Sequence, residues 1–135
     1  MIEMTDDASR CPCGTGMSYG ECCAPLLRGD VRAATAEQLM RSRYCAFALG
    51  DVDYVLRTWH PSTRPAPPLG LDDGTVWRRL DVLGSRGGGP FDRTCDVEFR
   101  AVWRRGSERG VLHETSRFVR EEGSWLYVDG DAWAE

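Results

Sequence analysis

The sequence predicts an α+β domain in which helices pack on one face of a curved, antiparallel four-stranded sheet, preceded by a small cysteine-rich module. Three observations indicate this fold class. Four of the six cysteines fall within residues 11–23, apolar residues recur at helical spacing over 36–59, and the apolar period changes to two beyond residue 75. Helices followed by a meander of strands are typical of α+β domains, and 135 residues suffice for one main core and a small module.

Composition restricts the class of protein and its partners. No apolar run approaches the roughly 18 residues that span a bilayer, so an integral membrane protein is excluded. The N-terminal MIEMTDDASR lacks the basic start and apolar stretch of a secretory signal, which predicts a cytoplasmic location with free thiols. The net charge of −4 makes nucleic acid an unfavourable partner, because phosphate contacts require a broad basic surface.

The cysteine-rich stretch CPCGTGMSYGECC has the spacing of a metal site. Two ligand pairs brought together by a short turn can supply the four soft ligands that zinc binds in a tetrahedron. Gly14 and Gly16 allow the positive φ that such a turn needs. A disulfide is less favoured, since adjacent cysteines bridge only with strain, and the Cys-x-x-Cys pattern of redox enzymes is absent. We therefore expect a structural tetrathiolate zinc site, with no open coordination position. Its ligands would be Cys11, Cys13, Cys22 and Cys23.

This stretch resembles the SEC-C motif, the zinc knuckle with the pattern C-x-C-x8-(H/C)-C. The motif is best known from the C-terminal tail of the SecA translocation motor, where it binds zinc and engages the chaperone SecB. The resemblance implies that the same four cysteines bind zinc and that the knuckle docks a protein partner. It does not specify the partner, because the knuckle recurs in bacterial proteins that have no export role.

Two helices are expected after the knuckle. Thr35 and Gln38 form a capping box, so a helix should run over residues 36–49 and end at Gly50. Asp51 then caps a second helix that reaches about Trp59, before the proline-rich loop of residues 61–75.

Four strands are expected at residues 77–83, 95–104, 111–121 and 124–129. Placing Glu98 opposite Arg117 sets the register of the two central strands by charge pairing. The inner, apolar face of the sheet then contains a polar patch. The patch comprises Glu114, Ser116 and Asp129.

Arg43 falls in the middle of the apolar face of the first helix, and a buried arginine needs a partner. We expect it to meet Glu114 or Asp129. The favoured interpretation is a structural ion pair that fixes the helix to the sheet. The other is a pocket in which Glu114 or Asp129 performs acid/base chemistry and Arg43 anchors an anionic ligand. The candidate ligand-binding residues are Arg43, Tyr44, Trp59, His60, Ser116 and Trp125.

Other reactive side chains have simpler interpretations. Neither His60 nor His113 has a second ligand at metal spacing, so capping or surface roles are favoured. Cys45 and Cys95 are expected to be small core residues, and Cys45 as a nucleophile with His60 as its base is disfavoured.

A second resemblance covers almost the whole chain. The segments TAEQLMRSRYCAFALGDVDYVLRTWHPSTR, VEFRAVWR and LHETSRFVREEGSWLYVDGD are similar to the YchJ family of uncharacterised bacterial proteins. The resemblance implies a SEC-C knuckle over residues 1–28 and a cone-shaped nuclear transport factor 2-like domain over 29–135. The resemblance does not indicate a catalysed reaction, because proteins with this fold include both enzymes and protein-binding adaptors.

The function expected from the sequence is that of a zinc-binding protein-interaction module. The knuckle would form the docking surface, and the α+β domain would supply bulk or a homodimer contact. The alternative is a small-molecule-binding protein or enzyme that uses the cavity of the cone. We favour the non-enzymatic interpretation, because the cysteine spacing is the most specific motif in the sequence.

Overall fold

The computed structural model describes residues 6–133 and confirms the α+β class, with helices beside an antiparallel four-stranded sheet. The outermost residues of both expected modules, 1–5 and 134–135, lie outside the described part. The sheet order is β1-β2-β3-β4. The longest helix in the described part of the chain has 14 residues, and none of its helices could span a bilayer. The elements are η1 (Tyr19–Glu21), α1 (Ala24–Leu27), α2 (Ala36–Leu49), α3 (Val52–Arg57), β1 (Thr75–Gly87), β2 (Thr94–Arg105), β3 (Glu108–Glu121) and β4 (Ser124–Trp133).

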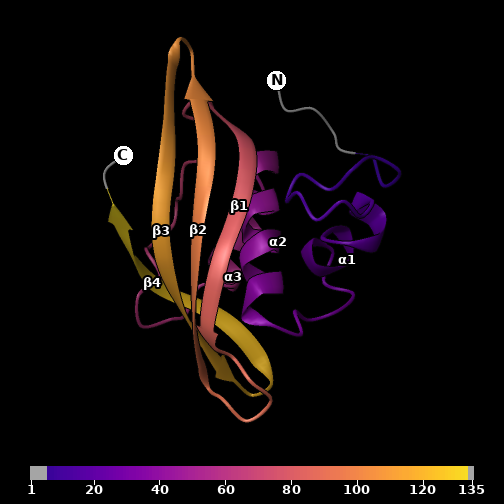
Figure 1. Cartoon of the computed structure of the whole chain (residues 1–135), viewed down its shortest axis with the longest axis vertical. Helices are drawn as coiled ribbons and strands as arrows, with labels where there is room; N and C mark the ends of the chain where they lie inside the picture. Colours follow the sequence, from indigo (N-terminus) through magenta and orange to yellow (C-terminus); the bar gives the residue numbers. More distant parts are fainter. Residues whose placement is uncertain (1–5, 134–135) are drawn as a thin grey trace.

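Helix α2 is the central element of the structure. Figure 1 shows it between the sheet and the N-terminal segment that carries α1. The Thr35 hydroxyl accepts a hydrogen bond from the Gln38 amide at 3.0 Å, and Gly50 ends the helix with φ at +77°. These caps confirm the predicted helix over 36–49. Helix α3 begins after its predicted Asp51 cap and ends at Arg57, two residues before the expected limit.

The strands are longer than their apolar pattern indicated, because their ends extend beyond the core. The predicted register was wrong by two residues, since Asp96 and not Glu98 lies opposite Arg117. Charge pairing cannot distinguish these registers, because both give Arg117 an acidic neighbour on the same face. A shift of two leaves every side chain on its predicted face, so Glu114 and Ser116 do face α2.

Asp129 is the residue that the sequence placed on the wrong face. The register of β3 and β4 shifts between Arg117 and Phe118, so that Phe118 pairs with Tyr127 while Arg117 pairs with Asp129. This β-bulge leaves Val128 as an extra residue and turns Asp129 to the outer face. There its carboxylate pairs with Arg117.

The N-terminal segment shares one hydrophobic core with the rest of the chain. Buried residues of the segment, among them Cys23, Ala24 and Leu26, join those of α2. Arg57 of α3 also donates a hydrogen bond to the Leu27 carbonyl at 2.8 Å. The knuckle is therefore packed onto the α+β domain, not suspended from it.

Candidate functional site

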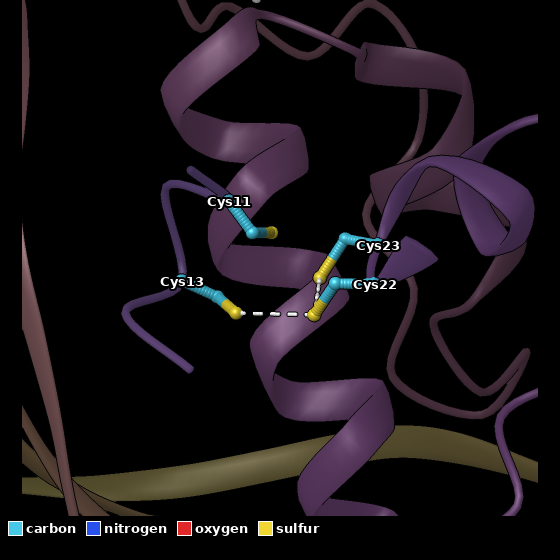
Figure 2. A group of neighbouring side chains, drawn as sticks. All are labelled: Cys11, Cys13, Cys22 and Cys23. Carbon is cyan, nitrogen blue, oxygen red and sulfur yellow. Dashed lines mark hydrogen bonds between the residues drawn. The ribbon is translucent and has the colours of Figure 1, made fainter. Parts of the chain in front are cut away.

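Two short turns bring the four clustered cysteines together. The first holds Cys11 and Cys13: the Cys11 amide donates to the Met17 carbonyl at 2.9 Å, and Gly14 adopts φ of +83° as expected. The second pair, Cys22 and Cys23, follows η1 and precedes α1. Figure 2 shows the four sulfurs facing one another in front of α2.

The sulfur positions match the dimensions of a tetrahedral metal site. All four Sγ atoms lie within 4.8 Å of one another, with Cys13 to Cys22 at 3.7 Å and Cys22 to Cys23 at 3.8 Å. Metal–sulfur bonds of about 2.3 Å in a tetrahedron put the sulfurs ~3.8 Å apart. The donor set therefore fits one soft divalent cation, coordinated by four thiolates with no position open to a substrate.

Hydrogen bonds between sulfurs shift the pKa values of the clustered thiols. Hydrogen bonds with Cys11 and Cys23 lower the pKa of Cys13, whereas those with Cys11 and Cys13 raise the pKa of Cys23. The four thiols therefore do not titrate independently of one another. A bound cation would replace the thiol protons and compensate the four negative charges, which is why metal binding at such sites depends on pH.

Three neighbouring residues support the cysteines. Thr15 Oγ1 lies 3.2 Å from the Cys22 sulfur, and Arg41 of α2 donates to the Cys13 carbonyl at 2.8 Å. The third neighbour is Cys45, whose sulfur lies 3.5 Å from that of Cys11. Cys45 is buried in the core, as the sequence predicted, but its contact with Cys11 was not predicted. The signal was its position one helical turn after Arg41, which puts both on the same side of α2.

A cavity of about 170 Å³ lies between α2 and the inner face of the sheet. It is lined by five of the residues expected there: Arg43, Tyr44, Trp59, Glu114 and Ser116. The structure adds apolar walls that the sequence analysis did not include among the candidates. Chief among these are Phe47, Trp77, Phe118 and Tyr127. The β-strand alternation from Trp125 to Tyr127 could have indicated the last of them.

Three of the expected residues lie outside this cavity. His60 contacts Glu121 at 2.8 Å through Nε2 and Ser62 through Nδ1, consistent with its expected surface role. Trp125 is buried against the Arg120 guanidinium, whose Cζ lies 5.1 Å from the ring centroid. Asp129 is on the outer face of the sheet. Acid/base chemistry in the cavity would therefore involve Glu114 and not Asp129.

Arg43 is buried as expected, but its partners differ from those expected. Its Nη1 donates to the Val55 carbonyl at 2.8 Å and to Thr58 Oγ1 at 2.7 Å. Among residues 6–133, no carboxylate forms an ion pair with it, because Asp129 points away and Glu114 accepts a hydrogen bond from Ser116 at 2.5 Å. Burial lowers the pKa of Arg43 to about 10, so the side chain remains charged at neutral pH.

Comparison with known proteins identifies relatives over nearly the whole chain. The family model of the YchJ middle NTF2-like domain matches residues 35–130. A UPF0225 protein of Corynebacterium glutamicum is 52% identical over 122 residues, covering 90% of this chain and 96% of that protein. One from Streptomyces coelicolor is 53% identical over 121 residues, covering 90% and 94%.

Two solved structures share the fold. A SEC-C motif containing protein from Rhodopseudomonas palustris has a TM-score of 0.80 and 38% identity, covering 91% of this chain and 98% of that one. A second, from Psychrobacter arcticus, has a TM-score of 0.77 and 28% identity, covering 98% and 87%. With its cysteine cluster and NTF2-like α+β fold, the chain belongs to the YchJ family of UPF0225 proteins.

Proposed function

We propose that this protein binds one structural zinc ion through Cys11, Cys13, Cys22 and Cys23 and uses the resulting knuckle to dock a protein partner in the cytoplasm. The observation that carries the proposal is the set of four sulfurs within 4.8 Å of one another, at the spacing of a closed tetrahedral site. A closed thiolate site has no position for a substrate, which favours a structural role over catalysis. Both solved relatives are SEC-C motif containing proteins, which supports the same assignment.

The exposed side of the knuckle is the proposed docking surface. Cys11, Cys13 and Cys23 are buried against α2, whereas the turn between the two cysteine pairs faces outward. Met17 projects from this turn with 47% of its surface exposed. An exposed methionine on a metal-stiffened turn suits protein recognition, because its flexible apolar side chain adapts to a partner and the rigid turn loses little entropy on binding.

Metal analysis tests the zinc assignment. Protein purified without chelators should contain one zinc per chain, and Cys11→Ser with Cys22→Ser should remove it. A zinc content well below one per chain, or full content in the double variant, would show that the tetrathiolate assignment is wrong.

Affinity capture tests the docking role with matched variants. Wild-type protein, Met17→Ser and Phe91→Ser would be used as baits, since Phe91 is 96% exposed but lies far along the chain in the β1–β2 connection. A knuckle partner should be captured by the wild type and Phe91→Ser and lost with Met17→Ser, at unchanged zinc content. Capture that is equal for all three baits would argue against the knuckle as the docking surface.

A further inference from the structure

Arg43 has hydrogen-bonding capacity that the protein does not use. Its side chain is only 5% exposed, and both of its hydrogen bonds come from Nη1. Guanidinium carries five N–H donors, so Nε and Nη2 retain donors that meet no acceptor among residues 6–133. Burying a charged group without its full set of partners is costly. These unused donors belong to a residue on the cavity wall.

The cavity beside Arg43 suits a flat, apolar body. Its walls are largely aromatic. The ring centroid of Tyr127 lies 4.5 Å from Arg43 Cζ, and that of Trp59 lies 5.2 Å from it. A protein cavity of roughly 150 Å³ can hold benzene. The 170 Å³ available here therefore admits one six-membered ring with small substituents.

A second polar group reaches the cavity from the sheet side. The Glu114 carboxylate accepts the Ser116 hydroxyl through Oε2, whereas Oε1 has no hydrogen-bond partner within residues 6–133. Gly130 on β4 leaves the space in which this carboxylate lies, because a Cβ there would overlap it. A ligand spanning the cavity would thus meet a donor on the α2 side and an acceptor on the β3 side.

An outer hollow adjoins this cavity. It measures about 290 Å³ and shares Phe47, Trp59 and Trp77 with the inner cavity. Its outer rim is formed by Leu69, Gly70, Leu71 and Asp73 of the proline-rich loop and by the end of β2. The two hollows are therefore adjacent, with these three aromatic side chains between them.

We propose that the cavity between α2 and the sheet binds a single-ring aromatic carboxylate that carries a hydrogen-bond donor at its far end. The carboxylate accepts from Nε and Nη2 of Arg43 in the bidentate geometry that guanidinium favours. The ring packs against the aromatic wall that Trp59 and Tyr127 form together, with their own ring centroids 5.1 Å apart. The distal hydroxyl or amine donates to Glu114. A monoanion matches the single unpaired charge of Arg43, whereas a phosphate dianion would bring excess charge toward Glu114. This site is separate from the metal cluster.

Calorimetric titration of the zinc-loaded full chain with para-hydroxybenzoate tests the proposal. The matched probe is para-hydroxybenzyl alcohol, which keeps the ring and donor but lacks the carboxylate. We expect saturable one-to-one binding of the carboxylate, and binding of the alcohol weaker by about tenfold or more. Benzoate, which lacks the distal donor, should bind several-fold more weakly than para-hydroxybenzoate.

Two variants locate the binding. Arg43→Met keeps an unbranched apolar side chain and should reduce the affinity for para-hydroxybenzoate to that of the alcohol. Arg79→Met is the control, because Arg79 is exposed on β1, paired with Asp81 and outside the cavity, and should bind as the wild type does. Chemical shift changes at the Trp59 and Trp77 indole N–H groups should accompany binding.

Three results would overturn the proposal. These are the absence of saturable binding up to ~10 mM para-hydroxybenzoate, equal affinity for the acid and the alcohol, and unchanged affinity in folded Arg43→Met. If that variant does not fold, the acid and alcohol pair on wild-type protein decides alone. Zinc content is measured in every sample, so a failure at the cavity is distinguished from a failure of the metal assignment.

Discussion

Arg43 places a positive charge in the protein interior. Two contributions to stability oppose each other there: the desolvation penalty of the guanidinium and the hydrogen bonds that it donates. Burial lowers the pKa of Arg43 from 12.5 to about 10, which corresponds to a penalty of about 3 kcal/mol. Its two hydrogen bonds to Val55 and Thr58 each contribute about 1.5–3 kcal/mol, as expected for a charged donor. Together the two bonds contribute about 3–6 kcal/mol, which equals or exceeds the penalty.

Arg43→Met should consequently lower the free energy of unfolding by roughly 0–3 kcal/mol, because the removed desolvation penalty offsets part of the lost hydrogen bonding. A buried ion pair, as the sequence led us to expect, would instead lose about 3–5 kcal/mol when one partner is removed. Urea unfolding of the variant and the wild type distinguishes the two. A loss of about 3–5 kcal/mol in the free energy of unfolding would show that Arg43 contacts a carboxylate in solution.

Gly130 determines where the Glu114 carboxylate can lie. A Cβ at position 130 would overlap that carboxylate, so Gly130→Ala should displace it from Ser116 and lower the free energy of unfolding by about 1–3 kcal/mol. Gly84→Ala in β1 is the matched control, because a Cβ there meets nothing within 4 Å. Urea unfolding measures both. Equal effects of the two substitutions would contradict the proposed packing of Glu114.

At the scale of elements, the helices and the central strands were predictable because their signals are local. Thr35, Gly50 and Asp51 mark the limits of α2 and α3 through side-chain and backbone chemistry within a few residues. The side chains of β2 and β3 that face α2 were also predicted correctly, although the predicted register was wrong by two residues. A strand has a period of two, so a shift of two residues leaves each side chain on the same face. Local patterns were therefore enough to predict that Arg43, Glu114 and Ser116 lie between α2 and the inner face of the sheet.

The bulge in β4 was not predictable from such patterns. It depends on how β4 pairs with β3, and the alternation of Trp125 and Tyr127 simply continues to Asp129 when no extra residue is inserted. The contact between Cys45 and Cys11 was missed for a related reason. It joins residues 34 positions apart, on two elements whose packing no local signal specifies.

The packing of α2 against the knuckle gives Cys45 a testable role. Its sulfur lies 3.5 Å from Cys11 Sγ, where the Cys45 S–H can donate to a metal-bound thiolate. We predict that Cys45→Ala keeps one zinc per chain but binds it roughly 10–100-fold more weakly, as expected when a group that supports a ligand is lost. Competition with a chromogenic chelator measures the affinity. Cys95→Ala, whose thiol lies on β2, is the control and should match the wild type.

A stoichiometry below one zinc in Cys45→Ala would instead show that Cys45 is itself a ligand. Unchanged affinity would show that the S–H contact contributes nothing to metal binding. Both results differ from the predicted one, in which Cys45→Ala still binds one zinc per chain but with lower affinity.

At the scale of the whole molecule, the knuckle and the α+β domain share one core, so the metal should stabilise both. Cys13 and Cys23 are buried with Ala24 and Leu26 in the same cluster as α2, and Arg57 ties α3 to the Leu27 carbonyl. Loss of the metal would leave four protonated thiols and remove the metal–sulfur bonds that join the two cysteine pairs. The knuckle would then detach and expose the face of α2 that it covers.

Metal removal should therefore lower the melting temperature of the entire chain, by at least about 10 °C, in one cooperative transition. Calorimetry of zinc-loaded and chelator-treated protein measures this, with near-ultraviolet circular dichroism reporting the tryptophans of the distant sheet. Because the metal binds thiolates, its stabilisation is present at neutral pH and lost as the pH falls and protons displace it. Two separate transitions, or a sheet signal that melts at the same temperature with and without metal, would show that the knuckle is an independent appendage.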